Sequence, residues 1–335
     1  MLGPDNFQHN ERRGTMLLLT RREPSEIAIL QGILHRLDKN ALNFKQFEDQ
    51  LARAKSGFIG EQRVDREWLD FQINKPYILL HSLHMKKDAE FTHQIDSLFI
   101  SQYFILIIEV KNYSGRIEFD ENTHQCTRTR PDGGVDGFGN PIDQVRRHAG
   151  FIKSQLSRLG YQLPIERAVI FSHPNAVLGK VNTDVLIFHV TGLRYKLARL
   201  FEKHQKAFIS KDELHLIGQE FIARQQPRKW EPKIDLSKLR KGVLCSQCNY
   251  SMQMIYEHGK WICPRCGSVD PNAFYEALNE YRLLWSNRIS NSEFREFMGI
   301  KSQKTTYRIL SGLDLETEGK LRHMRYIIPP NILEN

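Results

Sequence analysis

Apolar and polar residues alternate with two different periods along the first two thirds of the chain. Apolar residues at helical spacing predict one helix over residues 23–37 and another from about 58 to 71. After them come short apolar segments of strand type, at 77–83, 94–100, 104–110 and 115–119. Further on, an amphipathic helix is expected at 142–159, buried strands at 168–171 and 185–190, and helices near 193–204 and 211–224. The pattern predicts an α/β fold with a mixed β-sheet flanked by helices.

The remaining sequence differs in composition and divides into smaller parts. Residues 226–242 are rich in Pro, Lys and Arg, which predicts a basic linker after a first domain of residues 16–225. Residues 243–270 hold two cysteine pairs, and residues 271–335 are helical and then briefly extended. Residues 1–15 follow neither period, so we expect a disordered, leader-like or tag-like segment and assign it no function.

Two acidic residues lie on a predicted β-hairpin in the middle of the first domain. With a two-residue turn at 102–103, stepping outward along the ladder pairs Asp96 with Glu109, whose Cβ atoms would lie about 5 Å apart. Lys111 lies two residues beyond Glu109 and therefore points to the same side. A slip of one residue would separate the acids. In the predicted register, Asp96, Glu109 and Lys111 form one cluster.

Such a pair of acids has two interpretations. Two like charges at this distance raise each other's pKa unless a cation neutralises them, and carboxylate oxygens suit Mg²⁺ or Mn²⁺. Alternatively, Asp96 and Glu109 simply end two strands in solvent. The pairing across the hairpin favours the metal site.

Three further motifs accompany these acids. They are Gly57-Phe58-Ile59-Gly60-Glu61 at the start of a helix, Gln94-Ile95-Asp96 on a strand, and Ile108-Glu109-Val110-Lys111-Asn112 followed by Gly115. On a later helix, Gln144 and His148 stand one turn apart. Together they resemble the nuclease-related domain (NERD) family of the restriction-endonuclease-like PD-(D/E)XK superfamily over roughly residues 55–159. The resemblance implies that the mixed sheet and its helices have a restriction-endonuclease-like fold. This resemblance implies that Asp96 and Glu109 hold a catalytic metal and that Lys111 assists the attacking water or the transition state.

The resemblance also implies roles for two polar residues on helices. Glu61 matches the family's first motif, and it shares a helical stripe with Val64 and Trp68, so its carboxylate should point inward. The alternative is that Glu61 only stabilises the first turn of its helix electrostatically. Gln144 resembles the later Gln motif of the superfamily, in which an aromatic hydroxyl often stands where this chain has His148.

The strongest local motif is a set of four cysteines. Cys245 and Cys248 form one CxxC pair, Cys263 and Cys266 form a second, and 14 residues separate the pairs. Two such knuckles supply four thiolates to a tetrahedral Zn²⁺, and a closed site of this kind is structural. We therefore predict a zinc ribbon. The alternatives for its role are a metal staple for a small core and an additional contact surface for DNA or protein.

Two short helices around Gly299 are predicted after the ribbon, at 292–298 and 302–313. Their arrangement resembles a helix-turn-helix, with 321–328 as a wing. The second helix would present residue types that reach phosphates or base edges, namely Gln303, Lys304, Thr306 and Arg308. From residue 226 onward, 17 Lys and Arg stand against 12 Asp and Glu, a modest excess of five. A plain helical packing module is the alternative.

Composition narrows the class of protein. The chain carries 48 Lys and Arg against 39 Asp and Glu, a net charge of +9, which favours a polyanionic partner such as nucleic acid. The longest apolar run, 103–108, is far shorter than the roughly 20 residues of a membrane span. The apolar patch 16–19 is too short for a signal peptide, and paired cysteines suit a reducing compartment. We expect a cytoplasmic protein in which Cys126 is a free buried thiol.

These observations predict a Mg²⁺- or Mn²⁺-dependent nuclease acting on DNA, with Zn²⁺ as a structural ion. The resemblance suggests DNA processing or defence against phage or plasmid DNA as its context. A rival interpretation is a catalytically inactive DNA-binding or regulatory protein that keeps the nuclease fold as a scaffold. A third is an adaptor that uses the ribbon to form a homo-oligomer.

Overall fold

The computed structural model describes residues 8–10, 15–69, 73–88, 91–226 and 230–334, which fold into two compact units. The first unit comprises Met1–Glu23 and Lys55–Lys229, and the second comprises Pro24–Ala54 and Trp230–Asn335. Each unit has its own hydrophobic core.

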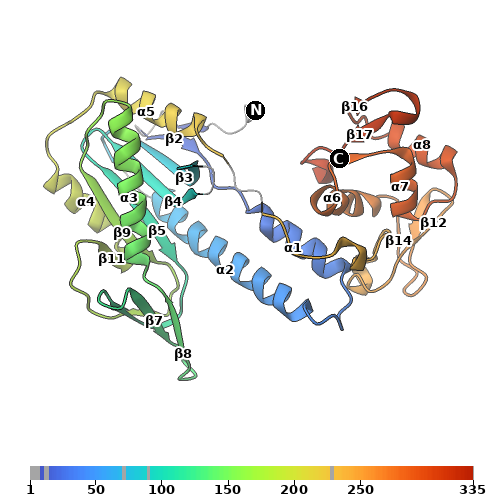
Figure 1. Cartoon of the computed structure of the whole chain (residues 1–335), viewed down its shortest axis with the longest axis horizontal. Coiled ribbons are helices and arrows are strands. Elements are labelled where there is room, and N and C mark those ends of the chain that lie inside the picture. The colour runs from blue at the N-terminus through green and yellow to red at the C-terminus, as the bar shows by residue number, and fades with distance from the viewer. Residues whose placement is uncertain (1–7, 11–14, 70–72, 89–90, 227–229, 335) are drawn as a thin grey trace. The chain divides into compact units, whose positions relative to one another are not determined.

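The first unit is built on a seven-stranded mixed sheet (Figure 1) with the strand order β1-β2-β3-β4-β5-β9-β11. Its strands are β1 (Gln8–Asn10), β2 (Thr15–Leu19), β3 (Tyr77–Lys86), β4 (Thr92–Ser101), β5 (Ile105–Lys111), β9 (Ile165–Phe171) and β11 (Leu186–His189). The pairs β3–β4 and β4–β5 are antiparallel, whereas β2–β3, β5–β9 and β9–β11 are parallel. The predicted mixed sheet is confirmed. Of the predicted leader, residues 8–10 form β1 and Thr15 begins β2, and 1–7 and 11–14 lie outside the described residues.

Helices cover both faces of this sheet, as its continuous apolar strands require. The helices α3 (Pro141–Arg158) and α5 (Lys211–Ala223) pack on one face through residues such as Val145 and Phe221. On the other face, α4 (Leu193–Lys203) packs together with the part of α2 (Phe44–Leu69) that carries Val64. Figure 1 shows α3 lying across its face of the sheet.

A second, four-stranded sheet extends the first unit beyond the prediction. It has the order β10-β6-β7-β8 and contains β6 (Gly115–Asp120), β7 (Gln125–Thr129), β8 (Val135–Gly139) and β10 (Ala176–Leu178). The predicted strand at 115–119 exists as β6, but it belongs to this second sheet. The strands β7 and β8 are short, and Cys126 is their one buried residue, so they lack the apolar run that identified the central strands.

The second unit includes a segment that we expected to introduce the first domain. The helix α1 (Ser25–Arg36) packs against α6 (Phe274–Leu284), where the buried Arg36 contacts Glu280 at 2.6 Å. Arg36 also donates to the carbonyl oxygens of Arg240 and Gly242, so residues 230–242 are packed structure rather than a free linker. The apolar stripe of α1 predicted the helix correctly, but a stripe does not specify which partner covers it.

The predicted ribbon and the C-terminal helices share a single core in the second unit. The ribbon consists of β12 (Ile255–Glu257), β13 (Lys260–Ile262) and β14 (Val269–Asp270). It is followed by β15 (Arg288–Ile289), α7 (Asn291–Met298), α8 (Gln303–Ser311), β16 (Thr317–Glu318) and β17 (Arg325–Ile327). Trp261 of the ribbon and Phe294 of α7 belong to one buried cluster, so the ribbon and the helices form one body.

The connection between α7 and α8 begins at Gly299, whose backbone is left-handed with φ +72°, a conformation that glycine adopts without strain. Short 3₁₀ helices complete the chain at Val190–Gly192, Leu236–Lys238, Ser246–Cys248, Leu321–His323 and Ile332–Glu334. Within the described ranges, every helix is too short or too polar to cross a lipid bilayer.

Candidate active site and cysteine cluster

The β4–β5 hairpin has the register that the sequence predicts. The ladder pairs Ile100 with Ile105 and continues to Ser97 and Ile108, and the Ser101 N–H donates to the Phe104 carbonyl across the two-residue turn. The next position outward in this register is Asp96 opposite Glu109. The hairpin therefore places both acids at the end of the same ladder.

Direct contacts join Glu109, Lys111 and Gln144. The Lys111 ammonium donates to Glu109 Oε1 at 2.6 Å and to Gln144 Oε1 at 3.2 Å. Gln144 lies in the first turn of α3, where the Asn140 side chain caps the helix by accepting the Ile142 N–H at 3.0 Å. Side chains from a strand and from a helix far along the chain thus meet at one ammonium group.

Both hairpin acids are buried and incompletely neutralised. Burial raises the pKa of Asp96, although the Lys111 ammonium and the Val110 N–H, which donates to Asp96 Oδ2 at 2.8 Å, oppose this shift. Burial, reinforced by the negative charge of Asp96, raises the pKa of Glu109 to about 8. For Lys111, burial alone would lower the pKa, but the pairing with Glu109 outweighs it and the pKa is raised.

The acids fit an oxygen-liganded divalent cation. Glu109 Oε2 is buried and has no hydrogen-bond partner among the described residues. A buried carboxylate oxygen without a partner is costly, and a cation is the ligand that would compensate it. Asp96 and Glu109 are therefore the residues that could hold Mg²⁺ or Mn²⁺.

Glu61 points inward, as its helical stripe predicts. Val64 and Trp68 on the same stripe are buried, and burial raises the pKa of Glu61 to about 7. The partner of this carboxylate is Arg21, which lies just after β2 and which the sequence analysis missed. Arg21 also pairs with Asp65, one turn further along α2. The spacing of Glu61 and Asp65 was visible in the sequence, but nothing there connected them to an arginine forty residues away.

Glycine at position 60 allows α2 to approach the end of β5. A Cβ atom on Gly60 would lie 2.5 Å from the Asn112 Cβ and 2.8 Å from the Ser172 Oγ. Asn112 in turn donates to the Ser56 carbonyl at 2.7 Å. The glycine and the asparagine of the two motifs thus hold the helix that carries Glu61 against the strand that carries Glu109.

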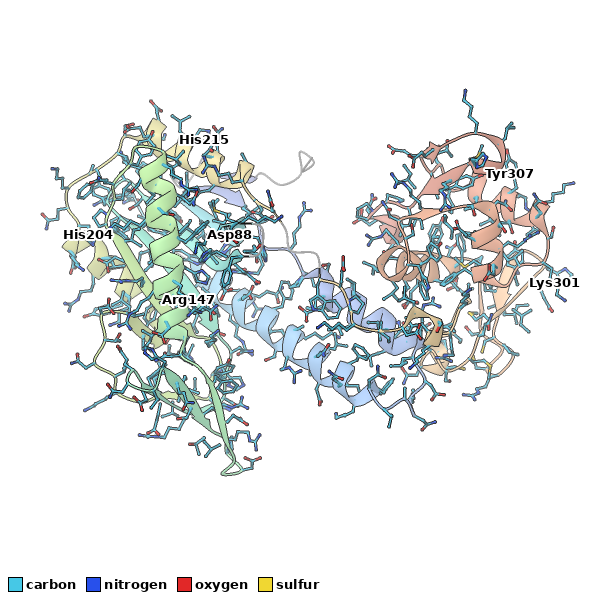
Figure 2. All side chains as sticks on the ribbon, viewed as in Figure 1. Asp88, Arg147, His204, His215, Lys301 and Tyr307 are labelled. Carbon is cyan, nitrogen blue, oxygen red and sulfur yellow. The ribbon has the colours of Figure 1, made fainter. Side chains whose placement is uncertain are left out.

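His148 is held by a second histidine. Its Nδ1 lies 3.1 Å from the Nδ1 of His93, and the His93 ring stacks on Phe151. Burial lowers the pKa of His148 to about 4, so the ring is neutral at pH 7. On the same helix, Arg146 is paired with Asp184 and Glu121, whereas Arg147 is exposed (Figure 2).

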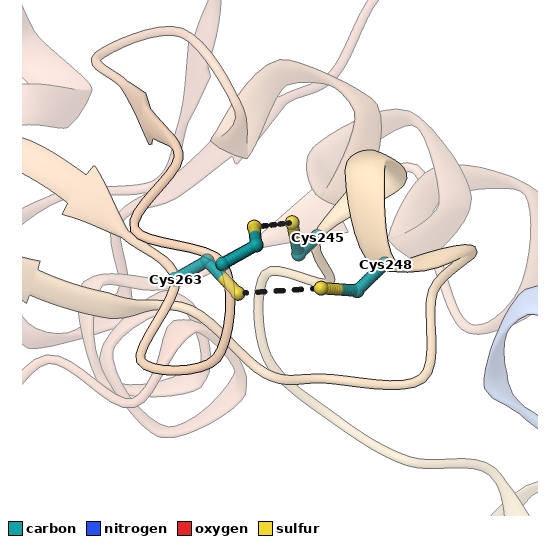
Figure 3. Close-up of side chains that lie close together, drawn as sticks. Cys245, Cys248 and Cys263 are labelled. Carbon is teal, nitrogen blue, oxygen red and sulfur yellow. Dashed lines mark hydrogen bonds between the residues drawn. The ribbon is translucent and has the colours of Figure 1, made fainter.

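The four predicted cysteines come together in the second unit. The sulfur atoms of Cys245, Cys248, Cys263 and Cys266 all lie within 4.8 Å of one another. The Cys245–Cys266 and Cys248–Cys263 sulfur pairs are each 3.7 Å apart (Figure 3), too far for a disulfide bond. A tetrahedron with bonds of about 2.3 Å between Zn²⁺ and sulfur places its sulfurs about 3.8 Å apart. The cluster therefore fits a metal ion such as Zn²⁺.

The residues expected to face nucleic acid divide into two groups. Gln303, Lys304 and Arg308 are exposed on α8. Thr306 is fully buried, and its hydroxyl donates to the Ser302 carbonyl at 3.1 Å, so its assignment to a nucleic-acid surface is wrong. Tyr307 of α8 and Lys301, which lies just before the helix, are also exposed; both are labelled in Figure 2, and the sequence analysis did not select them.

Comparison with known proteins supports this description of the first unit. Residues 56–172 match the family model described as nuclease-related domain, NERD. An uncharacterized protein of Bacillus anthracis is 29% identical over 166 residues, which cover 48% of this chain and 73% of that protein. The matched range contains all five candidate residues, namely Glu61, Asp96, Glu109, Lys111 and Gln144. Residues 56–172 are therefore similar to a nuclease-related domain.

Proposed function

We propose that the protein is a metal-dependent nuclease that hydrolyses phosphodiester bonds of DNA. The observation that supports this most is the convergence of Asp96, Glu109 and Lys111 at the end of one hairpin, inside the range that matches the nuclease-related domain. Two under-compensated buried acids beside an ammonium group form an arrangement suited to a divalent cation and a phosphate.

Each residue has a separate part in the proposed reaction. Bound Mg²⁺ or Mn²⁺ would supply Lewis acidity toward the phosphoryl group and the attacking water. Asp96 and Glu109 would hold that ion. The Lys111 ammonium would neutralise negative charge that develops on the phosphoryl oxygens, an effect worth about 2 to 4 kcal/mol for one preorganised contact. Gln144 holds Lys111 in place by accepting its second hydrogen bond.

The second unit supplies the surface that we propose contacts DNA. Lys301, Lys304 and Arg308 are exposed and make no ion pair with the residues that the structure describes. The acids of the neighbouring α7 are already neutralised, Glu293 by Arg325 and Glu296 by Lys241. Lys301, just before α8, and the exposed Lys304 and Arg308 of α8 are therefore available to phosphates.

A groove of about 930 Å³ extends this surface toward the ribbon. It lies between the β12–β13 hairpin and the start of α8, and its lining includes Gln253, Tyr256, His258, Lys301, Ser302 and Arg308. The lining also includes the acidic Glu257, but its aromatic, polar and cationic groups suit the bases and phosphates of a nucleic acid. We assign Zn²⁺ to the four cysteines as a structural ion that shapes one wall of this groove.

Cleavage of plasmid DNA in Mg²⁺ or Mn²⁺ tests the proposal. The wild type should convert supercoiled plasmid to nicked or linear forms, and Glu109→Ala and Lys111→Ala should not. Glu118→Ala and Lys153→Ala replace exposed residues of the same charge in the same unit, and they should cut like the wild type. Equal cutting by all five proteins would show that this site does not catalyse the cleavage. Binding of DNA without metal-stimulated cutting would instead support the scaffold interpretation.

A further inference from the structure

Arg21 is an almost completely buried cation in the first unit. Its side chain is only 3% exposed. Nε donates to Asp65 Oδ2 at 2.7 Å, and Nη1 donates to Glu61 and to the Ser82 hydroxyl. Nη2 donates to the other Asp65 carboxylate oxygen, to the Asp96 carbonyl at 2.9 Å and to the Ser97 hydroxyl at 3.1 Å. All three guanidinium nitrogens are therefore engaged, which is what a buried arginine requires.

The strands are distorted at the point where Arg21 binds. The β3–β4 ladder keeps one register from Tyr77 to Lys86, but the pair of Ser82 and Asp96 is missing from it. Ser82 has φ +48°, a left-handed conformation that is unfavourable for serine inside a strand. This local opening of the ladder leaves the Asp96 carbonyl and the Ser82 hydroxyl free to accept from Arg21. The distortion of the strands and the binding of Arg21 are therefore parts of the same local structure.

Formal charges around the hairpin acids show how many cations the site still needs. In their ionised forms, Glu61, Asp65, Asp96 and Glu109 carry four negative charges, and Arg21 and Lys111 supply two positive ones. The two uncompensated negative charges match one divalent ion.

The positions of the carboxylates also favour a single divalent ion. Within the described residues, Glu61, Asp96 and Glu109 do not bring three carboxylate oxygens within 4.8 Å of one another. Glu61 is instead turned to Arg21, and Asp96 is bound to Arg21 through its carbonyl while its carboxylate faces Val110. The Arg21 guanidinium thus lies between Glu61 and Asp96. A second metal ion at that position would have to take the same oxygen atoms as ligands.

We propose that Arg21 is a resident cation of the active site, which positions Glu61 and takes the place of a second metal ion, so that the site binds one divalent ion through Asp96 and Glu109. This inference rests on the proposed metal dependence. In this account Glu61 contributes through Arg21 and is a positioning residue.

Counting bound Mn²⁺ tests the inference without reference to cleavage. Zinc-loaded full-length protein is titrated with Mn²⁺, and free Mn²⁺ is measured by electron paramagnetic resonance. The wild type should bind one Mn²⁺ per chain, and Glu109→Ala should weaken that binding by roughly 100-fold or more. Arg21→Gln removes the charge but keeps hydrogen-bond donors, and it should bind two Mn²⁺. Arg21→Lys keeps the charge and should bind one.

Two results would overturn the role of Arg21. One is a wild type that binds two Mn²⁺ at Glu109-dependent sites, which can be measured even if Arg21→Gln fails to fold. The other is a folded Arg21→Gln variant with one Mn²⁺ at unchanged affinity. Plasmid cleavage measured in parallel separates the two proposals. If the wild type cuts DNA and binds two Mn²⁺, the role of Arg21 is contradicted and the proposed function stands. If it binds a single Mn²⁺ and does not cut DNA, the proposed function is contradicted and the role of Arg21 stands.

Discussion

The two candidate metal sites of this protein are assembled in opposite ways. The four cysteines lie within 22 consecutive residues, from Cys245 to Cys266, and two tight turns bring them together. The carboxylate site takes Arg21 from beyond β2, Glu61 from α2, Asp96 and Glu109 from a hairpin, and Gln144 from α3. A site made of neighbouring residues depends on its ligand and its turns, whereas a site made of distant residues depends on the packing of the whole unit.

Removal of zinc should have the largest effect and should act on the second unit alone. Cys245 and Cys263 are buried in the core that the ribbon shares with α6, α7 and α8. Structural zinc contributes about 10 kcal/mol or more to folding in small domains. Cys263→Ser should therefore abolish zinc binding and the cooperative thermal unfolding of the second unit, with the first unit retaining its own transition.

The free thiol Cys126 offers a control for this experiment. It lies in the core of the first unit, whereas the cluster belongs to the second. Cys126→Ala should keep one zinc per chain, measured as the zinc released when a reagent blocks the cysteine thiols. A Cys263→Ser protein whose second unit unfolds as in the wild type would show that the cluster is not a structural site.

Substitution of Gly60 should show that the carboxylate site depends on long-range packing. A Cβ atom at this position overlaps Asn112 and Ser172, so Gly60→Ala should lower the free energy of unfolding by about 1 to 3 kcal/mol. It should also impair Mn²⁺ binding, because it moves α2 relative to β5. Chemical denaturation and Mn²⁺ titration give the two readouts.

Gly57 lies on the same helix and provides a matched comparison. A Cβ atom there meets nothing within 4 Å. Gly57→Ala should raise the free energy of unfolding by about 0.5 to 1 kcal/mol, since alanine favours the helix more than glycine does. Equal effects of the two substitutions would contradict the proposed contact between α2 and the end of β5.

The pH dependence of stability should also separate the two sites. Glu109 and Glu61 have folded-state pKa values raised to about 8 and about 7, above the ordinary value of 4.5, because burial disfavours their charged forms. Their contribution to stability is present below pH 4.5 and is lost as the pH rises through 7 and 8. Zinc-loaded protein without Mg²⁺ or Mn²⁺ should therefore lose thermal stability in the first unit from pH 6 to pH 8.5.

Mn²⁺ should reverse this trend, because protons leave the acids when the ion binds. Mn²⁺ affinity should rise over the same interval, and Glu109→Gln should flatten the part of both profiles near pH 8. Thermal melts and Mn²⁺ titrations at each pH measure the two effects. A first unit whose stability rises with pH in the absence of Mn²⁺ would show that these acids are not the buried, under-compensated pair described above.

Substitutions on α8 should have the smallest effects. Lys304→Ala and Arg308→Ala should each lower DNA affinity by about 1 kcal/mol and reduce the salt dependence of binding by about one charge. Thr306→Val keeps the buried shape and should leave DNA affinity unchanged. Fluorescence anisotropy with the Glu109→Ala protein measures binding without cleavage. A large loss for Thr306→Val and none for Arg308→Ala would assign the DNA surface to another face.

Local patterns in the sequence determined a large part of this protein. Alternation of apolar residues predicted the central strands, and a short turn set the register that brings Asp96 to Glu109. The cysteine spacing predicted the cluster, and one helical stripe predicted that Glu61 points inward. These features depend on residues close together in the chain, whose relative positions follow from the geometry of a strand, a turn or a helix.

Tertiary structure alone decided the features that join distant segments. It placed α1 against α6 rather than in the first unit, and it turned Thr306 into the core. It also brought Arg21 to Glu61 and Asp65. An apolar stripe or a charged residue states that a partner is needed without specifying which one, since many distant residues satisfy the same requirement. The choice among them depends on how all elements of a unit pack at once.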